Sequence, residues 1–511
     1  MTTSIFPSYP PSLTPEQLSY LLTASTDWSL SHGLTVRPPP SFVAENPNGA
    51  LATHAPTTLF PSPFPRSCWN EAREVQKLFN ELYAKISADE EWLGKITEEL
   101  AEVDEFMARL YKVHLDVKKE GFVQDLSLGL FRSDYMIHVD PSSATSPPVI
   151  HQVEFNTVAS SFGGLSTLVS ELHRHLLRVG AYPQTGHPIK EENIPVSPAA
   201  QGVASGLAAA HKAYGSGGEG RKTAVLFITQ PDERNVFDQR WLEYNLSEKH
   251  DIQTYRISLR EVPTLTTLDP VTRALIYHPP HAPGVLVEIS TVYFRAGYGP
   301  GDYPSELEWA SRTTLERSKA IKCPSVITQL AGTKKVQQVL VTEGVVERFI
   351  TDPKLAQRIR GTFAAIHPLD NSPAGLAARE IALNSPEKYV LKPQREGGGN
   401  NIYRSKIPDF LRSIPESHWS VYILMELIEP PNLENIIARN GETMIGGVIG
   451  ELGVYGAVLW RDGEGEQRGK GVRTIISNEE SGWLLRTKGM DSEEGGVAAG
   501  FGSVDAVLLV D

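Results

Sequence analysis

The stretch YVLKPQREGGGNNIY, residues 389–403, carries the strongest structural and chemical signal in the chain. Its first residues predict a short strand that ends at Lys392, and a turn with Glu396 and three glycines follows. Glycine lets the backbone approach a ligand closely and turn its N–H groups toward phosphate oxygens. Lys392 offers a positive charge, and Glu396 offers an oxygen ligand for Mg²⁺. A glycine hairpin with a surface ion pair explains the glycines alone, but the combination favours a nucleotide-phosphate site.

A second polar cluster lies on a strand predicted over residues 149–156. Side chains alternate between the two faces of a strand, so Gln152, Glu154 and Asn156 are expected on one face. A carboxylate and an amide oxygen placed in this way suit Mg²⁺. The same alternation also fits an ordinary half-solvated strand. The small-residue turn at 160–164 follows directly, and its backbone N–H groups offer a place for a carboxylate.

Several basic residues stand near these two segments. Arginine binds carboxylate and phosphate groups in a planar, two-pronged manner, although a single arginine is more often a surface ion pair. Lys334 in the run AGTKK is similarly ambiguous. The candidate arginines are Arg132, Arg234, Arg295 and Arg486.

The common catalytic and nucleotide motifs are absent from the sequence. There is no G-x-x-x-x-G-K-[ST] loop, no H-E-x-x-H and no G-x-S-x-G. Residues 215–220 match G-x-G-x-x-G by letter, but they precede a predicted strand instead of following one, so the dinucleotide fingerprint fails. A nucleotide would therefore be held in another way.

Composition limits the class of protein. The chain has 511 residues, enough for about three domains. Its 48 basic and 61 acidic residues give a net charge of −13, which argues against nucleic-acid partners and against an anionic membrane surface. No apolar run reaches the ~18 residues that span a bilayer, and the N-terminus does not resemble a secretory signal. Two cysteines cannot form a disulfide framework. We therefore expect a large cytoplasmic protein.

Hydrophobic periodicity predicts a mixed α/β chain with three parts. Residues 1–220 are expected to contain a helix at 16–31, a helical region at 71–119 divided near Asp89 and Gly94, and the first strands. Residues 221–331 are expected to form an α/β module with a parallel sheet, whose strands include 223–229 and 285–294. Residues 332–511 contain the glycine-rich segment, predicted strands at 389–392 and 421–426, and a surface loop predicted over 461–478.

Taken together, these segments resemble the eukaryotic glutathione synthetase family. The resemblance covers nearly the whole chain, and its longest run is TQLAGTKKVQQ at 328–338. The other matching runs are FRSDYM at 131–136, VEFNT at 153–157, SFGGL at 161–165, ERNVFDQ at 233–239, YFRAGY at 293–298, CP at 323–324, KPQREGGGNN at 392–401, LLRTK at 484–488 and GGVAAG at 495–500.

The resemblance implies an ATP-grasp ligase fold with an inserted α/β substrate-binding domain and a homodimer. It implies that ATP drives the joining of γ-glutamylcysteine to glycine through an acyl phosphate, with Mg²⁺ as cofactor, two ions per active site. Such phosphoryl transfer depends on positioning and on neutralising negative charge.

The resemblance also assigns residues. The implied Mg²⁺ ligands are Glu154, Asn156 and Glu396. The implied catalytic residues are Arg132, Lys334, Lys392 and Arg486. The implied ATP site is Lys334, Lys392, Gly397, Gly398, Asn401, Tyr403, Met425, Glu426, Ile428, Glu451, Lys488 and Glu494. The implied substrate site is Arg132, Ser161, Glu233, Arg234, Asn235, Gln239, Arg295, Tyr298, Arg486, Val497 and Ala498.

Three positions depart from the family pattern and leave alternatives open. Ala159 stands where serine is expected, Leu427 where lysine is expected, and Glu494 where aspartate is expected. The small pair Ala498-Ala499 suits glycine as acceptor, while β-alanine or serine remains an alternative. A ligase that joins another carboxylate to another amine is distinguished by a substrate panel, and the presence of Glu233, Asn235 and Arg295 argues against it. A binding module without catalysis would have lost the Mg²⁺ ligands or the central arginines, and none of these is lost.

Overall fold

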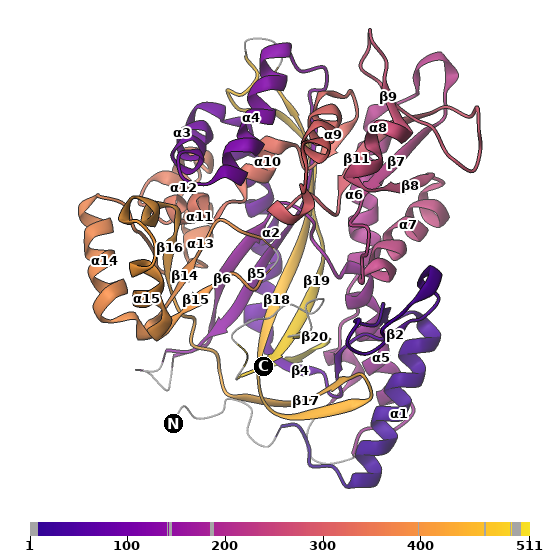
Figure 1. The fold of residues 1–511 in the computed structure, drawn as a ribbon. Helices are drawn as coiled ribbons and strands as arrows, with labels where there is room; N and C mark the ends of the chain where they lie inside the picture. Colours follow the sequence, from indigo (N-terminus) through magenta and orange to yellow (C-terminus); the bar gives the residue numbers. More distant parts are fainter. Residues whose placement is uncertain are drawn as a thin grey trace.

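A seven-stranded sheet forms the centre of the molecule (Figure 1). The computed structural model describes residues 9–140, 142, 146–183, 189–396, 398–463, 467–490, 492 and 502–511. The strand order is β17-β3-β20-β19-β18-β5-β6, and every pairing is antiparallel except β20 with β3. The strands are β3 (Thr57–Thr58), β5 (Leu126–His138), β6 (Val149–Asn156), β17 (Leu433–Arg439), β18 (Glu442–Asp462), β19 (Val472–Gly489) and β20 (Gly502–Asp505).

The surface loop predicted over 461–478 is wrong at both of its ends. Strand β18 continues to Asp462 and β19 begins at Val472. Residues 472–480 of β19 are partly buried or exposed, and their polar side chains do not give the apolar run of a fully buried strand.

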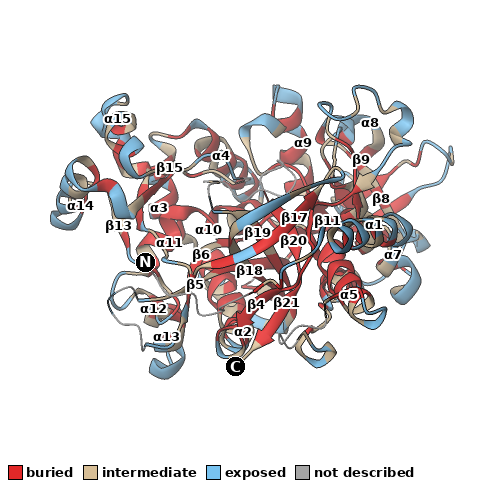
Figure 2. Cartoon of the chain, turned by 90° about the horizontal axis from the view of Figure 1, so that it is seen from below, coloured by how far each residue is buried: buried red, intermediate tan, exposed pale blue. Residues whose placement is uncertain are grey.

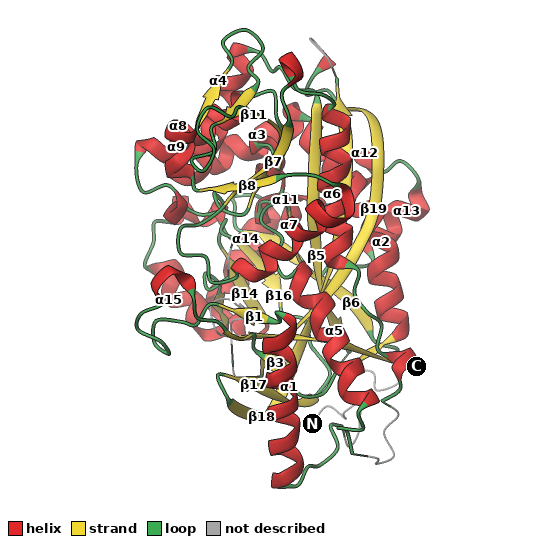
Figure 3. Cartoon of the chain, turned by 90° about the vertical axis from the view of Figure 1, so that its right-hand side faces the viewer, coloured by secondary structure: helices red, strands yellow, loops and turns green. Residues whose placement is uncertain are grey.

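Both faces of the central sheet are covered by helices. On β18, Val454 and Val458 pack into the core beneath α2 (Arg66–Ala88), whereas Ala457 and Leu459 pack into the opposite core with α5 (Gly163–Arg178) and α6 (Ala199–Tyr214). Figure 3 shows α5 and α6 running alongside the long strands. Burial is concentrated on these strands, while outer helices such as α14 (Pro373–Asn384) carry exposed residues (Figure 2).

Helix α6 lies unusually close to the sheet. A Cβ atom at Gly206 would lie 2.8 Å from Leu130 and 2.9 Å from Ala457. Such distances are too short for carbon atoms, so the absence of a side chain at Gly206 permits this packing.

The predicted helical region 71–119 is confirmed as parts of three helices. They are α2, α3 (Glu90–Ala101) and α4 (Glu105–Glu120). Asp89 separates the first two, and its side chain accepts a hydrogen bond from the Trp92 N–H as an N-cap. Gly94 was expected to divide helices but lies within α3, because tertiary packing outweighs the weak helix propensity of one glycine.

A second sheet occupies the region predicted as an α/β module. Strands β7 (Thr223–Ile228), β8 (Thr254–Ile257), β11 (Val287–Phe294) and β12 (Ile321–Cys323) pair in parallel. The sheet is not wholly parallel, however, because β9 (Thr266–Leu268) and β10 (Leu275–Tyr277) extend it as antiparallel strands. Each has only three residues, too few for a periodic signal. Its helices are α7 (Val236–His250), α8 (Val262–Leu265) and α9 (Glu306–Arg317). The domain boundaries at 220 and 331 stay predictions.

A small antiparallel sheet holds the glycine-rich segment. Its order is β13 (Ile366–Pro368), β16 (Ile423–Glu426), β14 (Tyr389–Lys392) and β15 (Ile402–Tyr403). Val421, expected within the β16 strand, instead ends a 3₁₀ helix, Glu416–Val421. Helices α11 (Lys334–Leu340), α14 and α15 (Ile407–Arg412) contact this sheet, whereas α10 (Val326–Ala331), α12 (Val345–Phe349) and α13 (Pro353–Arg360) contact α2.

The remaining elements complete the N-terminal side. The helix predicted over 16–31 is confirmed as α1 (Pro15–His32). Two small sheets pair β1 (Thr35–Val36) with β2 (Thr53–His54), and β4 (Ser62–Pro65) with β21 (Val507–Val510). Among the residues that the structure describes, no helix has the length and apolar character needed to cross a membrane.

Candidate active site

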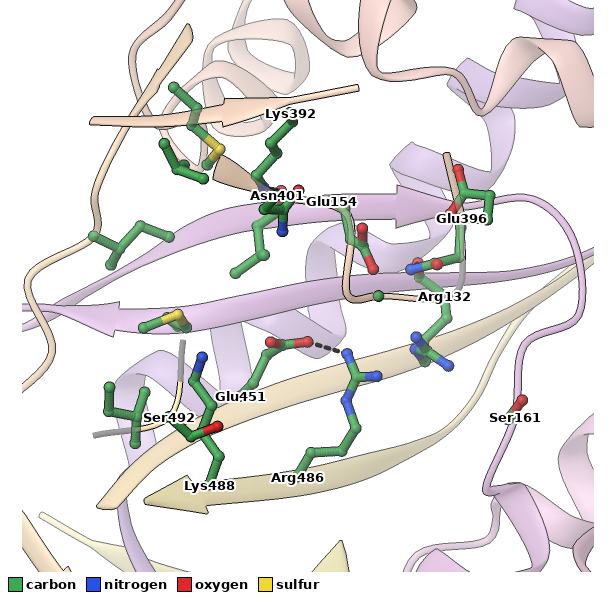
Figure 4. A pocket seen from close by; sticks show the side chains of 18 of the residues that line it. Arg132, Glu154, Ser161, Lys392, Glu396, Asn401, Glu451, Arg486, Lys488 and Ser492 are labelled. Atoms are coloured by element: carbon green, nitrogen blue, oxygen red, sulfur yellow. Dashed lines mark hydrogen bonds and ion pairs between the residues drawn. The ribbon is translucent and has the colours of Figure 1, made fainter. Parts of the chain in front are cut away.

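The two carboxylates predicted to bind a metal lie beside one another. Lys334 Nζ, at the start of α11, lies 3.1 Å from Glu154 Oε2 and 3.0 Å from Glu396 Oε1. Glu154 belongs to β6 of the central sheet, and Glu396 to the loop after β14 of the small sheet. Figure 4 shows both side chains in the space between the two sheets. Segments far apart in the sequence therefore converge on one site.

A bulge in β6 determines which of its side chains reach this site. Asp134 of β5 pairs with Glu154, but the next pair skips Val153. Such an extra residue reverses the alternation of the strand. Glu154 and Asn156 consequently line the cavity, whereas Gln152 is fully buried away from it. The expectation that Gln152 shares their face is wrong.

A second lysine joins the two sheets. Lys392, at the end of β14, donates a hydrogen bond from Nζ to the carbonyl oxygen of Val153 at 2.9 Å. Burial, only partly offset by the charge of Glu154, lowers the pKa of Lys392 to about 8. The charge on this lysine is therefore sensitive to any anion that binds nearby.

The two glutamates differ in their affinity for protons. Burial raises the pKa of Glu154, but the positive charges of Lys334 and Lys392 outweigh burial and hold that pKa well below its ordinary value. Burial also raises the pKa of Glu396, and Lys334 offsets this only in part, so that pKa stays above its ordinary value. Glu154 is thus the more firmly ionised partner.

Two arginines lie side by side on the central sheet and share one carboxylate. Asp134 binds Arg132 through two hydrogen bonds, at 2.6 Å to Nε and 2.8 Å to Nη2, and binds Arg486 Nη2 at 2.9 Å. Arg486 also pairs with Glu451 of β18 (Figure 4). Burial lowers the pKa of Arg132, but the charge of Asp134 outweighs it and leaves that pKa above its ordinary value. Both guanidinium groups remain positively charged.

A cavity of about 720 Å³ joins these groups. Its volume falls within the range of sites that enclose small molecules. Most of the sequence-predicted residues line it: Arg132, Glu154, Asn156, Ser161, Glu233, Asn235, Arg295, Tyr298, Lys392, Glu396, Gly398, Asn401, Tyr403, Met425, Glu426, Ile428, Glu451, Arg486 and Lys488.

One end of the cavity has an apolar wall suited to a flat ring. Met425 of β16 pairs with Val390 of β14, and both side chains line the cavity together with Leu427. Asn401 Nδ2 donates to Tyr403 Oη at 3.3 Å and holds the ring of that tyrosine in the wall. This combination of apolar side chains with a few polar groups is typical of small-molecule pockets.

The other end is polar and is built from the second sheet. Arg295, just after β11, donates to the carbonyl oxygen of Ser160 and to Ser161 Oγ, both at 2.7 Å. Glu233 accepts from Gln239 Nε2 at 2.6 Å and from the Asn235 N–H at 2.7 Å. An arginine and a glutamate held apart in this way suit a ligand with both a carboxylate and an ammonium group.

The turn at 160–164 does bind a carboxylate, but that carboxylate belongs to the protein. Asp238 accepts hydrogen bonds from the N–H groups of Phe162 at 2.7 Å, Gly164 at 2.8 Å and Leu165 at 3.2 Å. It therefore caps helix α5 and connects it to α7. Through Ser160 and Ser161, the same turn also holds the Arg295 guanidinium group.

Seven of the predicted site residues are not among the described residues that line the cavity. Lys334 contacts the lining through Glu154 and Glu396, and Gln239 contacts it through Glu233. Arg234 points elsewhere, since its Nε donates to the carbonyl oxygen of Arg37. Gly397, Glu494, Val497 and Ala498 lie outside the described residues.

Sequence reasoning missed Asp134 and Gln230. Asp134 lies two residues from Arg132 on β5, and period-two alternation would have placed both on one face. Gln230 lines the cavity and donates from Nε2 to Tyr298 Oη at 3.0 Å and to Asp302 Oδ1 at 2.8 Å. It follows β7 directly, and the ends of parallel strands are a general location for ligand contacts.

The oxygen-rich part of the site fits Mg²⁺ better than a softer metal. No cluster of three or more His, Cys, Asp or Glu side chains suited to a metal is found within the described ranges. Asn156 donates from Nδ2 to Asp134 at 3.0 Å, which leaves its amide oxygen for a ligand. Two carboxylates and one amide oxygen match the few protein ligands that Mg²⁺ uses when a nucleotide phosphate supplies the rest.

The chain is similar to known proteins over nearly its whole length. A family model described as "Eukaryotic glutathione synthase, ATP binding domain" matches residues 15–509. The glutathione synthetase large chain of Schizosaccharomyces pombe is 38% identical over 513 residues, which cover 97% of this chain and 98% of that protein. Glutathione synthetase of Homo sapiens is 37% identical over 494 residues, with 96% of each chain covered.

A solved structure has the same fold. The apo form of a glutathione synthetase-like effector from Globodera pallida matches with a TM-score of 0.73 and 22% identity, and the match covers 98% of both chains. At this identity the likeness concerns the fold alone. The full-length sequence matches go further: the chain belongs to the eukaryotic glutathione synthase family, the ATP-dependent ligases of glutathione biosynthesis.

Proposed function

We propose that the protein joins the cysteinyl carboxylate of γ-glutamylcysteine to the amine of glycine, with conversion of ATP to ADP and phosphate. The observation that carries the proposal is the convergence of Lys334, Lys392, Glu154 and Glu396 beside the paired arginines in one cavity. The apolar end of the cavity suits adenine, and the polar end suits the γ-glutamyl group.

The proposed reaction has two steps. The cysteinyl carboxylate attacks the γ-phosphorus of ATP, the bond to the bridging oxygen breaks, and ADP leaves with an acyl phosphate formed. The glycine amine then attacks the acyl carbon, inorganic phosphate leaves, and the amine gives up a proton. Both steps build negative charge on oxygens, and positioned cations stabilise such charge most strongly in a water-poor site.

The two lysines and the two arginines have different tasks in this proposal. Lys392 and Lys334 bind the phosphate oxygens from the side of the small sheet. Arg132 and Arg486 hold the cysteinyl carboxylate and neutralise the charge that develops during phosphoryl transfer. Arginine suits this task because its planar donors match a carboxylate and its charge is permanent.

Glu154, Asn156 and Glu396 are the residues that would hold Mg²⁺. When bound, Mg²⁺ neutralises charge on the phosphate oxygens. The carboxylates themselves orient Lys334, whose ammonium lies between them. We assign two ions per site, cytoplasmic location and a homodimer as further parts of the proposal.

The decisive experiment is an ADP-release assay with the purified protein. We expect release to require γ-glutamylcysteine and glycine together with Mg²⁺. Replacement of glycine by β-alanine or serine should give little release, since the relatives described above are named for glutathione and give no support to another acceptor. ADP release that depends on neither substrate would refute the assignment.

A further inference from the structure

We propose that Asp134 is a positioning residue of the ligation reaction. Its carboxylate holds Arg132 and Arg486 next to each other and sets the orientation of the Asn156 amide. The inference rests on the proposed roles of those three residues. Asp134 does not line the cavity among the described residues, so it acts through them and not on the substrate.

Asp134 lies at the centre of a network of buried donors. Both of its oxygens bind Arg132, and Oδ2 also accepts from Arg486 at 2.9 Å and from Asn156 Nδ2 at 3.0 Å. The Asp134 side chain is 0% exposed and that of Arg132 is 6% exposed. Two guanidinium groups repel each other at short range in a buried site, and the shared carboxylate of Asp134 compensates this repulsion, together with Glu451 on the side of Arg486.

The same carboxylate decides which way the Asn156 amide points. Only the NH₂ end of an amide can donate to a carboxylate. The Asn156 nitrogen donates to Asp134 and, at 3.3 Å, to the carbonyl oxygen of Arg132. The amide oxygen is thereby the end presented to a cation. One aspartate thus sets the geometry of both the substrate arginines and a proposed metal ligand.

The neighbouring strand leaves room for this network. Gly453 of β18 pairs with Asp134, and a Cβ atom there would lie 2.8 Å from Arg132 Cδ and 2.8 Å from Asp134 Oδ1. Any side chain at this position would displace the arginine–aspartate pair. By contrast, a Cβ at Gly450 on the same strand would make an ordinary contact of 3.5 Å with Leu485.

The first test is the variant Asp134→Asn, which keeps the shape of the side chain and removes its charge. We expect kcat to fall roughly 100-fold, because a small misplacement of positioning groups has an effect of this size. The KM for γ-glutamylcysteine should rise, whereas the Kd for ATP measured without Mg²⁺ should change much less, since the hydrogen bonds of the Asp134 carboxylate go to Arg132, Arg486 and Asn156 and not to the proposed ATP residues. Steady-state kinetics and ATP titration give this comparison.

A double-mutant cycle separates positioning from general support of the fold. In an Arg132→Ala background, Asp134→Asn should have much less effect on kcat than in the unchanged protein, since its main partner is gone. Wild-type kcat in Asp134→Asn, or an equally large loss in both backgrounds, would overturn the inference. If Arg132→Ala alone leaves kcat and the KM for γ-glutamylcysteine unchanged, the proposed substrate site is wrong, and this result is distinct from a failure of the Asp134 proposal.

Glycine variants decide the question if Asp134→Asn does not fold. Gly453→Ala retains the aspartate but displaces the Arg132–Asp134 pair, and we expect a lower kcat with little change in the Kd for ATP measured without Mg²⁺. Gly450→Ala is the matched control and should retain kcat. Equal kcat values in the two glycine variants would overturn the proposal.

Discussion

Glu154 and Glu396 face each other across one ammonium group: Lys334 Nζ lies 3.1 Å from the first carboxylate and 3.0 Å from the second. Glu154 lies on the central sheet and Glu396 in the loop after β14 of the small sheet, so Lys334 links the two parts of the fold. In water a pair of like charges so close together would separate, but here a buried cation compensates them. A divalent cation can bind between the same oxygens only if it displaces the Lys334 ammonium group or if the bound nucleotide has already drawn that group away.

The first prediction concerns the metal. Glu396→Gln removes the negative charge of one proposed Mg²⁺ ligand. We expect the Mg²⁺ concentration that gives half-maximal ADP release to rise at least tenfold, in line with the effects of altered metal-site residues. Mg²⁺ titration of activity and Mn²⁺ binding measured by electron paramagnetic resonance provide two readouts. Glu429→Gln is the control, because Glu429 lines the same cavity but is solvent-exposed and is not a proposed ligand. An equal shift in the control would contradict the metal assignment.

The second prediction concerns Lys392. Lys392→Met keeps the length and the apolar stem of the side chain but removes the ammonium group. We expect ATP to bind at least tenfold more weakly and turnover to be lost, because the phosphate charge is no longer neutralised. Circular dichroism should show an unchanged fold. Normal turnover would mean that the glycine-rich segment serves only as a structural turn.

The third prediction concerns pH. Because burial lowers the pKa of Lys392 to about 8, the protein without nucleotide loses this charge as pH rises through 8. ATP phosphates favour the charged form, so binding at pH 8 should take up a proton, and the Kd for ATP should increase above that pH. Calorimetry in two buffers with different ionisation enthalpies measures the proton uptake. Lys392→Met should abolish it; persistence of the uptake in that variant would assign it to another group.

The fourth prediction compares two arginines that sequence reasoning placed together. Arg295 is held against Ser161 at the cavity, whereas Arg234 donates to the Arg37 backbone. Arg295→Ala should therefore raise the KM for γ-glutamylcysteine at least tenfold, consistent with loss of a charged hydrogen bond of about 1.5–3 kcal/mol. Arg234→Ala should change this KM much less. The reverse order of effects would argue that Arg234 reaches the substrate.

The fifth prediction concerns stability. Asp505 is buried among Thr58, Ser62 and Thr487, and burial raises its pKa to about 6 from the ordinary 3.8. Between these pH values the folded protein binds more protons at this site than the unfolded chain does, so stability decreases as pH rises through the interval. Asp505→Asn cannot titrate and should give a flatter profile of Tm between about pH 4 and 6. An unchanged slope would show that other groups cause the dependence.

Much of the chemistry was readable from local patterns. Residues 389–403 predict a strand, a terminal lysine and a glycine turn, and the structure has β14 ending at Lys392 with Glu396 beyond it. Such features depend on a few consecutive residues, and backbone preferences act at that range. The resemblance to the family then named most of the other predicted residues that line the cavity.

Only the tertiary structure decided which side chains meet. The bulge at Val153 turned Gln152 away from the cavity, and the partly buried first half of β19 did not show a buried-strand pattern. Asp134 and Gly453 are more than three hundred residues apart in the chain, and only the pairing of β5 with β18 places them next to each other. The sequence by itself determined the residue types and the local elements, because these follow from short-range backbone and side-chain preferences. Packing determined the register between strands and the partner of each charge, because these depend on groups distant in the chain competing for the same space.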